Sequence, residues 1–374
     1  MKSKKICIGV DSFGLNHGMS GGGAYLLELL TNIVCDGNEH IELCVFGHEL
    51  DRYTYTFSNA HFIGINTADN PLADLFWHKT QLNSFIKSHN FQAMLYVSGF
   101  RFLPLSFTVP SFLLVNEIPK EVNFFASLYF KHVIERVRGF IVPSRYIQDA
   151  LLEFGVPQYK IAIIFDGVNR NIFTPLSFES EEVLRLQPFA IKRPYIIYAS
   201  SLSSIDKCHI ELIKAFNIFK KNMGAPHRLV LAGHEGQMTE MVRNEVLHSH
   251  YSQDILLTGY FPHESLNRLY AAADVCIFPS RKEGSVFPIL EAMASGVPTA
   301  CSGEGALREV AEEATLYFDS TNPDSIATSI QSLVKCPENE EIRSRLIKCG
   351  LECARKHSWK KTADETLAYL LAKL

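Results

Sequence analysis

The stretch 274–298 constrains the fold more than any other part of the sequence. Its apolar run 274–278 predicts a buried strand that ends at Pro279. Pro288 suits the first turn of a helix, and Gly296 suits the position just after its last turn. A strand, a loop and a helix in this order form the repeating unit of a parallel α/β sheet. The loop at the carboxyl end of such a strand favours phosphate binding, because the helix directs its N–H groups and positive dipole end there.

Two glutamates frame this loop and helix. Glu283 lies in the loop, where its carboxylate can reach a ligand above the sheet, and Glu291 lies in the first turns of the helix, where it can accept hydrogen bonds from hydroxyl groups. The spacing alone carries little weight, because 40 of the 374 residues are acidic and most acid pairs are solvated charges. A surface glutamate and a helix-capping glutamate in an ordinary αβ unit are the alternative interpretation.

In its context, the sequence EGSVFPILEAMASGVP (283–298) closely resembles the Glu-x7-Glu motif of retaining GT-B glycosyltransferases, specifically of glycosyltransferase family 4. The resemblance extends over nearly the whole chain. It is strongest over 194–330, good over 139–173 and weaker over 48–135. It implies an α/β GT-B fold, in which two Rossmann-like, doubly wound domains face a central cleft.

The length and the strand pattern also predict two domains. A chain of 374 residues exceeds one usual hydrophobic core, and strand-length apolar runs alternate with helical periodicity, as in parallel sheets. The runs of the amino half are 6–10, 41–47, 93–99, 111–115 and 139–144, and a second series begins at 194–200. We predict a linker with a short helix over 174–193. With the resemblance, this gives an acceptor-binding domain over 1–185, to which a terminal helix (357–374) returns, and a donor-binding domain over 190–356.

Composition excludes several classes of protein. With 47% hydrophobic and 20% charged residues the chain is typical of a soluble globular protein, and no run approaches the roughly 20 apolar residues that span a bilayer. The apolar run 6–10 is too short for a signal-peptide core. A net charge of −4 argues against nucleic-acid binding. The nine scattered cysteines contain no C-x-x-C pair, which predicts reduced thiols in the cytoplasm and neither disulfides nor a zinc site.

Two candidate site regions lie in the first domain. Gly21, Gly22 and Gly23 allow close approach of a ligand to the backbone before a helix, and with Tyr25 they resemble the family's Gly-x-Gly-x-Tyr opening, which faces the donor phosphates. The alternative is that the three glycines only mark a loop and do not contact a ligand. Asn116 stands where many relatives have histidine near the transferred sugar. It can bond a sugar hydroxyl but cannot shuttle protons near neutral pH, and a strand-end turn residue is the alternative.

The second domain supplies the expected phosphate site. Lys207 sits at the lysine position of the family's donor loop, which implies a diphosphate ligand, although a lone lysine is normally a solvated charge. Ser201 takes the place of the usual arginine, and Cys208 that of the usual glycine. The loss of the arginine removes a bidentate donor, and Arg281 and Lys282 are candidates to replace it.

Further donor contacts are expected around the two loops of that domain. The resemblance places the nucleobase against the loop that contains Tyr260, and the donor against Ser285, Val286 and Phe287. Val286 replaces a glycine common in relatives. Its bulk could narrow the sugar pocket, because valine resists unusual backbone angles.

The segment 121–139 combines clustered aromatic residues with Lys131, His132, Arg136 and Arg138. Such a combination suits peripheral contact with a membrane if the acceptor is lipid-linked. A core-facing aromatic stripe with a solvated basic face is the alternative, and it is favoured by ordinary helix amphipathicity.

The resemblance implies a retaining hexosyltransferase with a UDP- or GDP-sugar donor and a glycan or glycolipid acceptor, in bacterial surface polysaccharide such as lipopolysaccharide. Glu283, Lys207 and Asn116 would act in catalysis, and Glu291 would hold the ribose. The sequence contains no Asp-x-Asp motif, so neither a catalytic metal nor a cofactor is expected, and we expect a cytoplasmic enzyme at the inner face of the membrane. The alternatives are a catalytically inactive GT-B binding subunit, and an epimerase or phosphorylase on the same fold.

Overall fold

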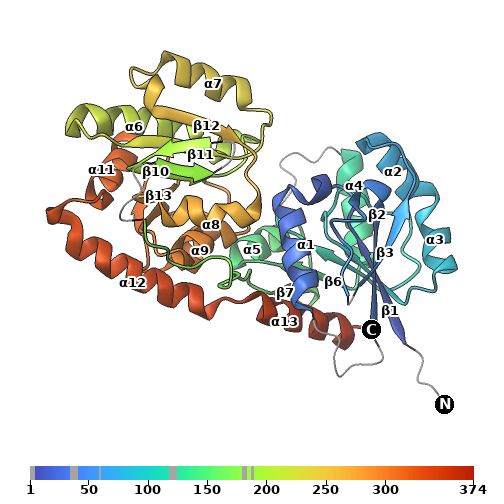
Figure 1. The fold of residues 1–374 in the computed structure, drawn as a ribbon. Coiled ribbons are helices and arrows are strands. Elements are labelled where there is room, and N and C mark those ends of the chain that lie inside the picture. Colours follow the sequence, from blue (N-terminus) through green and yellow to red (C-terminus); the bar gives the residue numbers. More distant parts are fainter. Residues whose placement is uncertain (1–4, 34–40, 59, 118–123, 179–182, 187–188) are drawn as a thin grey trace. The chain divides into compact units, whose positions relative to one another are not determined.

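The computed structural model describes residues 5–33, 41–58, 60–117, 124–178, 183–186 and 189–374. The chain divides into two compact units (Figure 1). Unit 1 comprises 1–166 and 359–374, and unit 2 comprises 167–358.

Unit 1 is built on a parallel sheet of seven strands in the order β3-β2-β1-β4-β5-β6-β7. The strands are β1 (Ile6–Asp11), β2 (Ile41–His48), β3 (Ala60–Ile65), β4 (Ala93–Tyr96), β5 (Ser111–Leu114), β6 (Gly139–Val142) and β7 (Ile161–Ile163). The order reverses direction between β1 and β4, and ligands of open α/β sheets bind at the carboxyl ends of strands beside such a turning point. The helices are α1 (Gly21–Asn32), α2 (Pro71–Thr80), α3 (Leu82–Ser88), α4 (Phe124–Arg136), α5 (Arg145–Glu153) and α13 (Trp359–Ala372).

The last helix, α13, completes the core of unit 1, as the resemblance implied. The ring of Trp359 meets that of Tyr25 from α1 edge-on at 5.2 Å, and the ring of Tyr369 meets that of Phe112 from β5 at 6.0 Å. The hydroxyl of Thr362 donates a hydrogen bond to the carbonyl of Phe165 at 2.7 Å. Tyr25 is therefore a buried packing residue in this unit.

Unit 2 repeats the architecture with a parallel sheet of six strands in the order β12-β11-β10-β13-β14-β15. The strands are β10 (Tyr195–Ala199), β11 (Arg228–Ala232), β12 (Ile255–Gly259), β13 (Val275–Phe278), β14 (Thr299–Ser302) and β15 (Leu316–Phe318). The helices are α6 (His209–Met223), α7 (Thr239–His248), α8 (His263–Ala271), α9 (Phe287–Ala294), α10 (Ala306–Ala311), α11 (Pro323–Leu333) and α12 (Glu340–Lys356). The turning point lies between β10 and β13. Both predicted Rossmann-like sheets are thus present.

The predicted linker is corrected in two respects. No short helix forms in the described part of 174–193, which instead contains an antiparallel hairpin of β8 (Val183–Leu186) and β9 (Phe189–Lys192). Leu184 and Ile191 are each buried between two exposed neighbours, and this alternation favours strands.

The division between the units also falls earlier than the expected boundary after residue 185. The segment from 167 packs on unit 2, because the ring of Phe173 contacts those of His263 and Tyr270, and the amide of Thr174 donates a hydrogen bond to Asn267 at 3.1 Å. The strand β3 was not predicted, because His61 and Gly64 interrupt its apolar run.

Candidate active site

The stretch 274–298 forms the strand, loop and helix that its sequence predicts. Every residue of β13 is buried, α9 begins after Val286 with Pro288 in its first turn, and Gly296 follows the helix with a positive φ of 73°. Glu283 lies in the loop between them. This loop leaves the carboxyl end of β13, at the turning point of the sheet in unit 2.

Lys207 and Glu283 meet at this turning point. Lys207 ends the 3-10 turn Ile205–Lys207 that follows β10, and its Nζ lies 2.7 Å from Oε1 of Glu283. The two side chains are 22% and 21% exposed. Two residues that are 76 positions apart in sequence therefore form one acid–base pair that solvent and ligands can reach.

Further cations surround this pair. The guanidinium of Arg281 donates to Oδ1 of Asp206 at 3.3 Å, and Nζ of Lys282 lies 3.6 Å from the same oxygen. Within the described part of the chain, the buried Nε of Arg281 has no hydrogen-bond partner. Ser201 supplies only a hydroxyl, which contacts that of Ser203 at 2.9 Å. Arg281 and Lys282 thus lie beside the turn that carries Lys207, where a replacement for the missing arginine was expected.

Two further histidines, His209 and His234, lie close enough to Lys207 for its positive charge to affect their pKa. Burial and the charge of Lys207 lower the pKa of His209, the first residue of α6, to about 4. The same two causes lower the pKa of His234, which follows β11. Both imidazoles are therefore uncharged at neutral pH, as an electropositive site requires.

Glu291 lies on α9 and is paired with a histidine that the sequence analysis missed. Nε2 of His263, the first residue of α8, lies 2.6 Å from Oε1 of Glu291. Burial raises the pKa of the Glu291 carboxyl, and the contact with His263 acts against that rise. The ring of Phe173 contacts that imidazole at 5.1 Å. The only sequence feature that could have suggested His263 is its place at the start of the helix after the Tyr260 loop.

The position of Glu283 depends on a glycine in a neighbouring loop. Gly305 has a φ of 63°, and a Cβ atom built there would lie 2.9 Å from the carbonyl oxygen of Glu283. The next residue, Ala306, donates its amide hydrogen to that carbonyl at 2.9 Å. The loop between β14 and α10 thus packs backbone against backbone on the Glu283 loop, which leaves no room for a side chain at Gly305.

The remaining donor-site residues of unit 2 occupy varied environments. Val286 is buried with φ of −125°, so this position does not require the backbone freedom of glycine. Cys208 also stands where relatives have glycine, and its φ of 54° lies in the left-handed region. This backbone conformation is strained for a residue other than glycine. Phe287 is buried at the start of α9, and Ser285 is half-buried before it. Tyr260 is 45% exposed and follows Gly259, which has a φ of 70°.

In unit 1 the three glycines are not a loop before a helix, as expected, but the first turn of α1 itself. The hydroxyl of Ser20 caps this helix by accepting the amide hydrogen of Gly23 at 3.1 Å. A Cβ at Gly23 would lie 2.6 Å from Cα of Gly18, whereas a Cβ at Gly21 would meet open space. Gly23 is therefore required by backbone packing, whereas a Cβ at Gly22 would meet a side-chain atom, Cδ2 of Leu15, at 3.0 Å.

Asn116 lies just beyond β5, at the carboxyl end of that strand. Its Oδ1 is buried and has no hydrogen-bond partner among the described residues. Because buried polar atoms are nearly always bonded, this oxygen is suited to a ligand.

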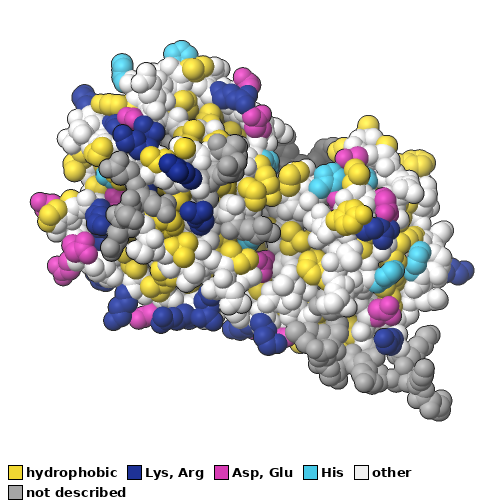
Figure 2. Space-filling model, viewed as in Figure 1, with side chains coloured by type: hydrophobic (Ala, Val, Ile, Leu, Met, Phe, Trp, Pro, Cys, Tyr) yellow, Lys and Arg dark blue, Asp and Glu magenta, His cyan; other side chains and the backbone are white. Residues whose placement is uncertain are grey.

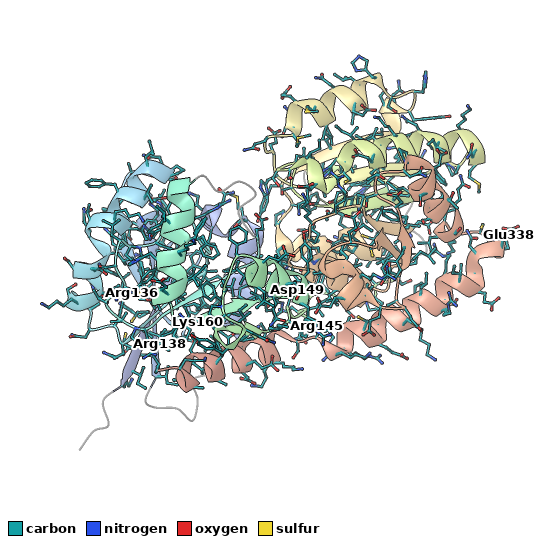
Figure 3. The ribbon with its side chains drawn as sticks, turned by 180° about the vertical axis from the view of Figure 1, so that it is seen from behind. Arg136, Arg138, Arg145, Asp149, Lys160 and Glu338 are labelled. Carbon is teal, nitrogen blue, oxygen red and sulfur yellow. The ribbon has the colours of Figure 1, made fainter. Side chains whose placement is uncertain are left out.

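Only part of the expected membrane segment can be assessed, because 121–123 and the side chains of 124–127 lie outside the described residues. The remainder of α4 exposes Leu128 and Lys131, and Arg136 and Arg138 are exposed near Lys160 (Figure 3). Lys160 itself donates to the carbonyls of Ile134, Glu135 and Val137 and so caps the end of α4. Basic side chains also line the exposed face of α12, at Arg345, Lys348, Arg355 and Lys356 (Figure 2). Positive charge alone therefore does not single out this segment.

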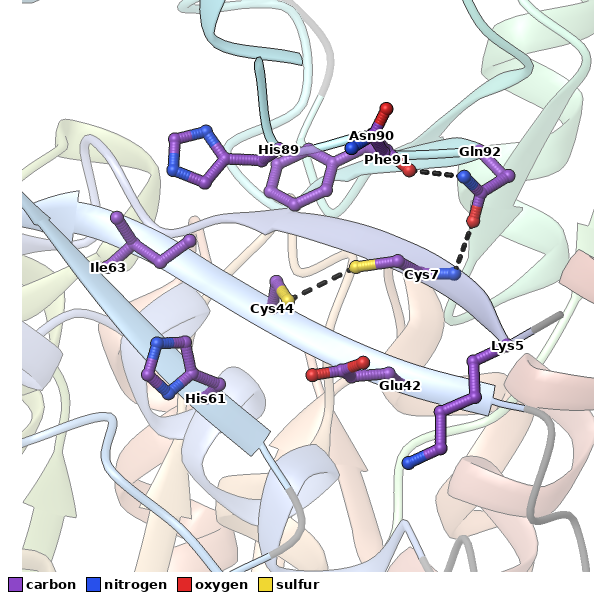
Figure 4. Close-up of a pocket in the computed structure, with 10 residues that line it drawn as sticks. All are labelled: Lys5, Cys7, Glu42, Cys44, His61, Ile63, His89, Asn90, Phe91 and Gln92. Carbon is purple, nitrogen blue, oxygen red and sulfur yellow. Dashed lines mark hydrogen bonds between the residues drawn. The ribbon is translucent and has the colours of Figure 1, made fainter. Parts of the chain in front are cut away.

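A pocket of about 600 Å³ lies elsewhere in unit 1 (Figure 4). Its lining residues are Lys5, Cys7, Glu42, Cys44, His61, Ile63, His89, Asn90, Phe91 and Gln92. They come from the first residues of β1, β2 and β3 and from the turn after α3, whereas ligands of such sheets bind at the carboxyl ends of strands. The pocket contains none of the residues expected from the sequence, so we place the candidate site at Lys207 and Glu283.

The described residues contain neither a candidate metal cluster nor a candidate membrane-spanning helix. Within the described ranges, no three or more His, Cys, Asp or Glu side chains are grouped so as to hold a metal ion. None of the helices there combines the length and the apolar character needed to cross a bilayer.

The two sheets, their turning points and the returning helix define a GT-B fold. Sucrose-phosphate synthase from Thermosynechococcus elongatus superposes with a TM-score of 0.77 at 18% identity, covering 99% of this chain and all of that one. Anabaena HepE in complex with UDP-glucose gives a TM-score of 0.72 at 14% identity, again over 99% of this chain and all of the other. At such identities the likeness concerns the fold.

Residues 181–351, a little less than half of the chain, match the family model described as glycosyl transferases group 1. The O-antigen chain mannosyltransferase B of Escherichia coli is 34% identical over 162 residues, which are 43% of this chain and 42% of that protein. The chain spans about half the length of the curated relatives it matches. The matched segment contains Lys207, Glu283, Glu291 and His263.

Proposed function

We propose that the chain is a glycosyltransferase of family 4, which moves a hexose from a UDP- or GDP-sugar to a glycan or glycolipid acceptor. Transfer proceeds with retention of the anomeric configuration and without a catalytic metal. The observation that carries this proposal is the partly exposed Lys207–Glu283 pair at the turning point of the unit 2 sheet.

The pair suits the charge changes of sugar transfer. The acceptor oxygen bonds to the anomeric carbon, the bond from that carbon to the diphosphate breaks, and the acceptor proton leaves with the diphosphate. The leaving diphosphate gains negative charge, which Lys207, Arg281 and the positive end of α9 stabilise. When the donor binds, Lys207 exchanges Glu283 for phosphate oxygens. Glu283 then accepts a hydrogen bond from a hydroxyl of the donor sugar.

Glu291 holds the ribose of the donor in this proposal, and Tyr260 lies at the nucleobase. Backbone groups of Ser285, Val286 and Phe287 contact the donor, and the first turn of α1 at Gly21, Gly22 and Gly23 faces its phosphates. Asn116 bonds a hydroxyl of the transferred sugar through its buried Oδ1, which is otherwise without a partner among the described residues.

The donor and the setting are inferred from relatives. HepE is seen with UDP-glucose, and the relative from Escherichia coli is named for mannosyl transfer to O-antigen, so we propose a hexosyl donor and a surface polysaccharide. The cytoplasm, at the inner face of the membrane, is the proposed location. This location is supported by the eight described cysteines, which are all free thiols. Cys7 and Cys44 remain free although their sulfur atoms lie 3.2 Å apart.

The test combines donor binding with turnover. UDP, GDP, ADP and their hexose conjugates are compared for their effect on the melting temperature, and transfer to a lipid-linked glycan is followed by mass spectrometry. Glu283→Gln keeps the shape of the side chain but removes its charge. We expect transfer to fall by at least about a hundredfold, with the melting temperature unchanged. Glu313→Gln, an exposed acid outside the site, is the matched control.

Each contrary outcome has a distinct meaning. Near wild-type transfer by Glu283→Gln would falsify the assigned role of this carboxylate. If no nucleotide stabilises the wild type, the chain is a binding subunit without a donor site. If the donor is altered at the same rate with and without acceptor, an epimerase is indicated.

A further inference from the structure

The contact between His263 and Glu291, the residue expected to hold the ribose, is short and largely buried on the glutamate side. Nε2 of His263 lies 2.6 Å from Oε1 of Glu291, whose side chain is only 4% exposed, whereas the imidazole is 29% exposed. The imidazole must donate, because a carboxylate can only accept. Among the described residues, the side chain of Glu291 forms one hydrogen bond, the contact of its Oε1 with His263. One carboxylate oxygen is thus fixed, and the other is available to a ligand.

The imidazole is itself held in place by its surroundings. The ring of Phe173 meets it at 5.1 Å with an interplanar angle of 64°. Asn267, one helical turn along α8, accepts from the amide of Thr174 and from the hydroxyl of Ser295, both at 3.1 Å. The segment around Phe173, α8 and α9 are therefore joined at the position where His263 meets Glu291.

Among the groups around Glu291, His263 is the one that favours the ionised carboxylate. Tyr270 from α8 and Cys276 from β13 face the carboxylate, and burial raises the pKa of both, so they remain uncharged. From α12, Gly350 packs on Met293 and brings no charge. Burial disfavours the ionised form of Glu291, and His263 opposes that effect.

We propose that His263 is a positioning residue for nucleotide recognition: its Nε2–H orients the Glu291 carboxylate so that Oε2 accepts a ribose hydroxyl. The inference rests on the proposed function, in which Glu291 holds the ribose. Phe173 supports the same geometry by fixing the ring of His263. The ligand class that this arrangement selects is a ribonucleoside diphosphate over its dideoxy counterpart.

The experiment compares two substitutions and two nucleotides. His263→Leu removes the donor, and His263→Gln places an amide N–H near the position of Nε2. The probes are the ribonucleoside diphosphate that most stabilises the wild type among UDP, GDP and ADP, and its 2′,3′-dideoxy form. We expect His263→Leu to weaken binding of the ribonucleotide about tenfold or more and binding of the dideoxy form less than about twofold. His263→Gln should restore most of the lost affinity.

A pH profile provides a readout that a purely structural role would not move. The ionised carboxylate of Glu291 accepts the hydroxyl more strongly than the neutral carboxyl does, so binding to the wild type falls as the pH drops through the raised pKa of this carboxyl. Removal of His263 leaves the effect of burial unopposed. The acid limb of the binding profile should therefore move to higher pH by about one unit or more in His263→Leu.

His248→Leu, an exposed histidine on α7, is the control and should change neither readout. The inference is overturned if His263→Leu weakens binding of both nucleotides equally and leaves the acid limb of the binding profile in place. His263 would then be a packing residue only. The inference also fails, while donor binding stands, if the wild type binds both nucleotides equally. If the wild type binds neither nucleotide, the proposed function fails as well.

Discussion

Both units place acid–base pairs at the carboxyl ends of the strands beside the turning point, but the pairs differ in exposure. In unit 1, Asp11 at the end of β1 pairs with His78 of α2 at 2.9 Å, and both side chains are fully buried. In unit 2, Lys207 and Glu283 form a pair of similar length, 2.7 Å, that is about one-fifth exposed. The same topology therefore produces a closed pair in one unit and an open pair in the other.

The closed pair of unit 1 belongs to a larger group of contacts. His48 pairs with Asp74 at 3.0 Å, and His17 pairs with Asp51 at 2.5 Å and with Asp69 at 3.1 Å. His78 uses both ring nitrogens, since Nδ1 meets the carbonyl of Asp74 at 2.6 Å and Nε2 meets Asp11. Two acceptors are best satisfied by two N–H groups, so this geometry favours the imidazolium form of His78. Burial opposes this charge, but Asp11 prevails and the pKa of His78 is raised.

From this comparison we expect exposure, and not the presence of a charged pair, to separate a stabilising contact from the proposed ligand site. Substitution of the closed pair should affect folding, whereas substitution of the open pair should affect function. Both tryptophans, Trp77 and Trp359, are buried in unit 1, so tryptophan fluorescence reports the unfolding of this unit. Far-UV circular dichroism reports both units.

The largest effect is expected for Asp11→Ala, which leaves a buried imidazolium without its counter-charge. We expect the free energy of unfolding of unit 1 to fall by about 3–5 kcal/mol, measured by urea denaturation with tryptophan fluorescence. The double variant Asp11→Ala/His78→Leu should recover part of this loss, because no buried charge remains. Glu283→Gln should change stability by less than about 1 kcal/mol, since its pair is partly exposed. A similar stability loss in Asp11→Ala and Glu283→Gln would remove the distinction between the two pairs.

A smaller effect is expected for Gly305→Ala, which acts on the open pair through the backbone. The methyl group would meet the Glu283 carbonyl, and alanine disfavours a φ of 63°. We expect unit 2 to lose about 1–3 kcal/mol, seen by circular dichroism and not by tryptophan fluorescence, and sugar transfer to fall because the Glu283 loop shifts. Gly303→Ala is the matched control, since its Cβ would meet only Nη1 of Arg308 at 3.8 Å. Full activity in Gly305→Ala would show that this loop does not position Glu283.

The smallest effect concerns the pH dependence of unit 1. The hydrogen bond to Asp51 raises the pKa of His17 above 6.5, so its contribution to stability is complete below pH 6.5 and is lost as the pH rises through the raised value. In fluorescence-detected melts between pH 6.5 and 8, the wild type should lose more stability than His17→Gln. The difference should stay within about 1 kcal/mol, because this pair is partly exposed and screened. Parallel profiles of the two proteins would contradict the role of His17.

The sequence predicted the elements of unit 2 better than its contacts. The strand at 274–278, Pro288 and Gly296 gave a local pattern that the structure repeats, and the family resemblance pointed to the turn that carries Lys207. His263 and Gly305 were missed because their roles depend on residues that are far away in sequence, Glu291 and Glu283, and no local pattern encodes such contacts.

Unit 1 was less predictable for the same physical reason. Asp11 and His78 are 67 residues apart, and each looks ordinary in its own segment. The strand β3 was missed because a histidine and a glycine interrupt its apolar run. The donor-site roles assigned to Asn116 and to the three glycines of α1 stay predictions that the binding experiments test.

The return of α13 to unit 1 also determines the order in which the chain is assembled during synthesis. The core positions of Tyr25 and Phe112 lack their partners until Trp359 and Tyr369 have left the ribosome. At about 5–20 residues per second, the roughly 190 residues of unit 2 delay that moment by about 10–40 seconds. The part of the protein that is made first is therefore completed last, and its apolar surface has to be protected in the interval.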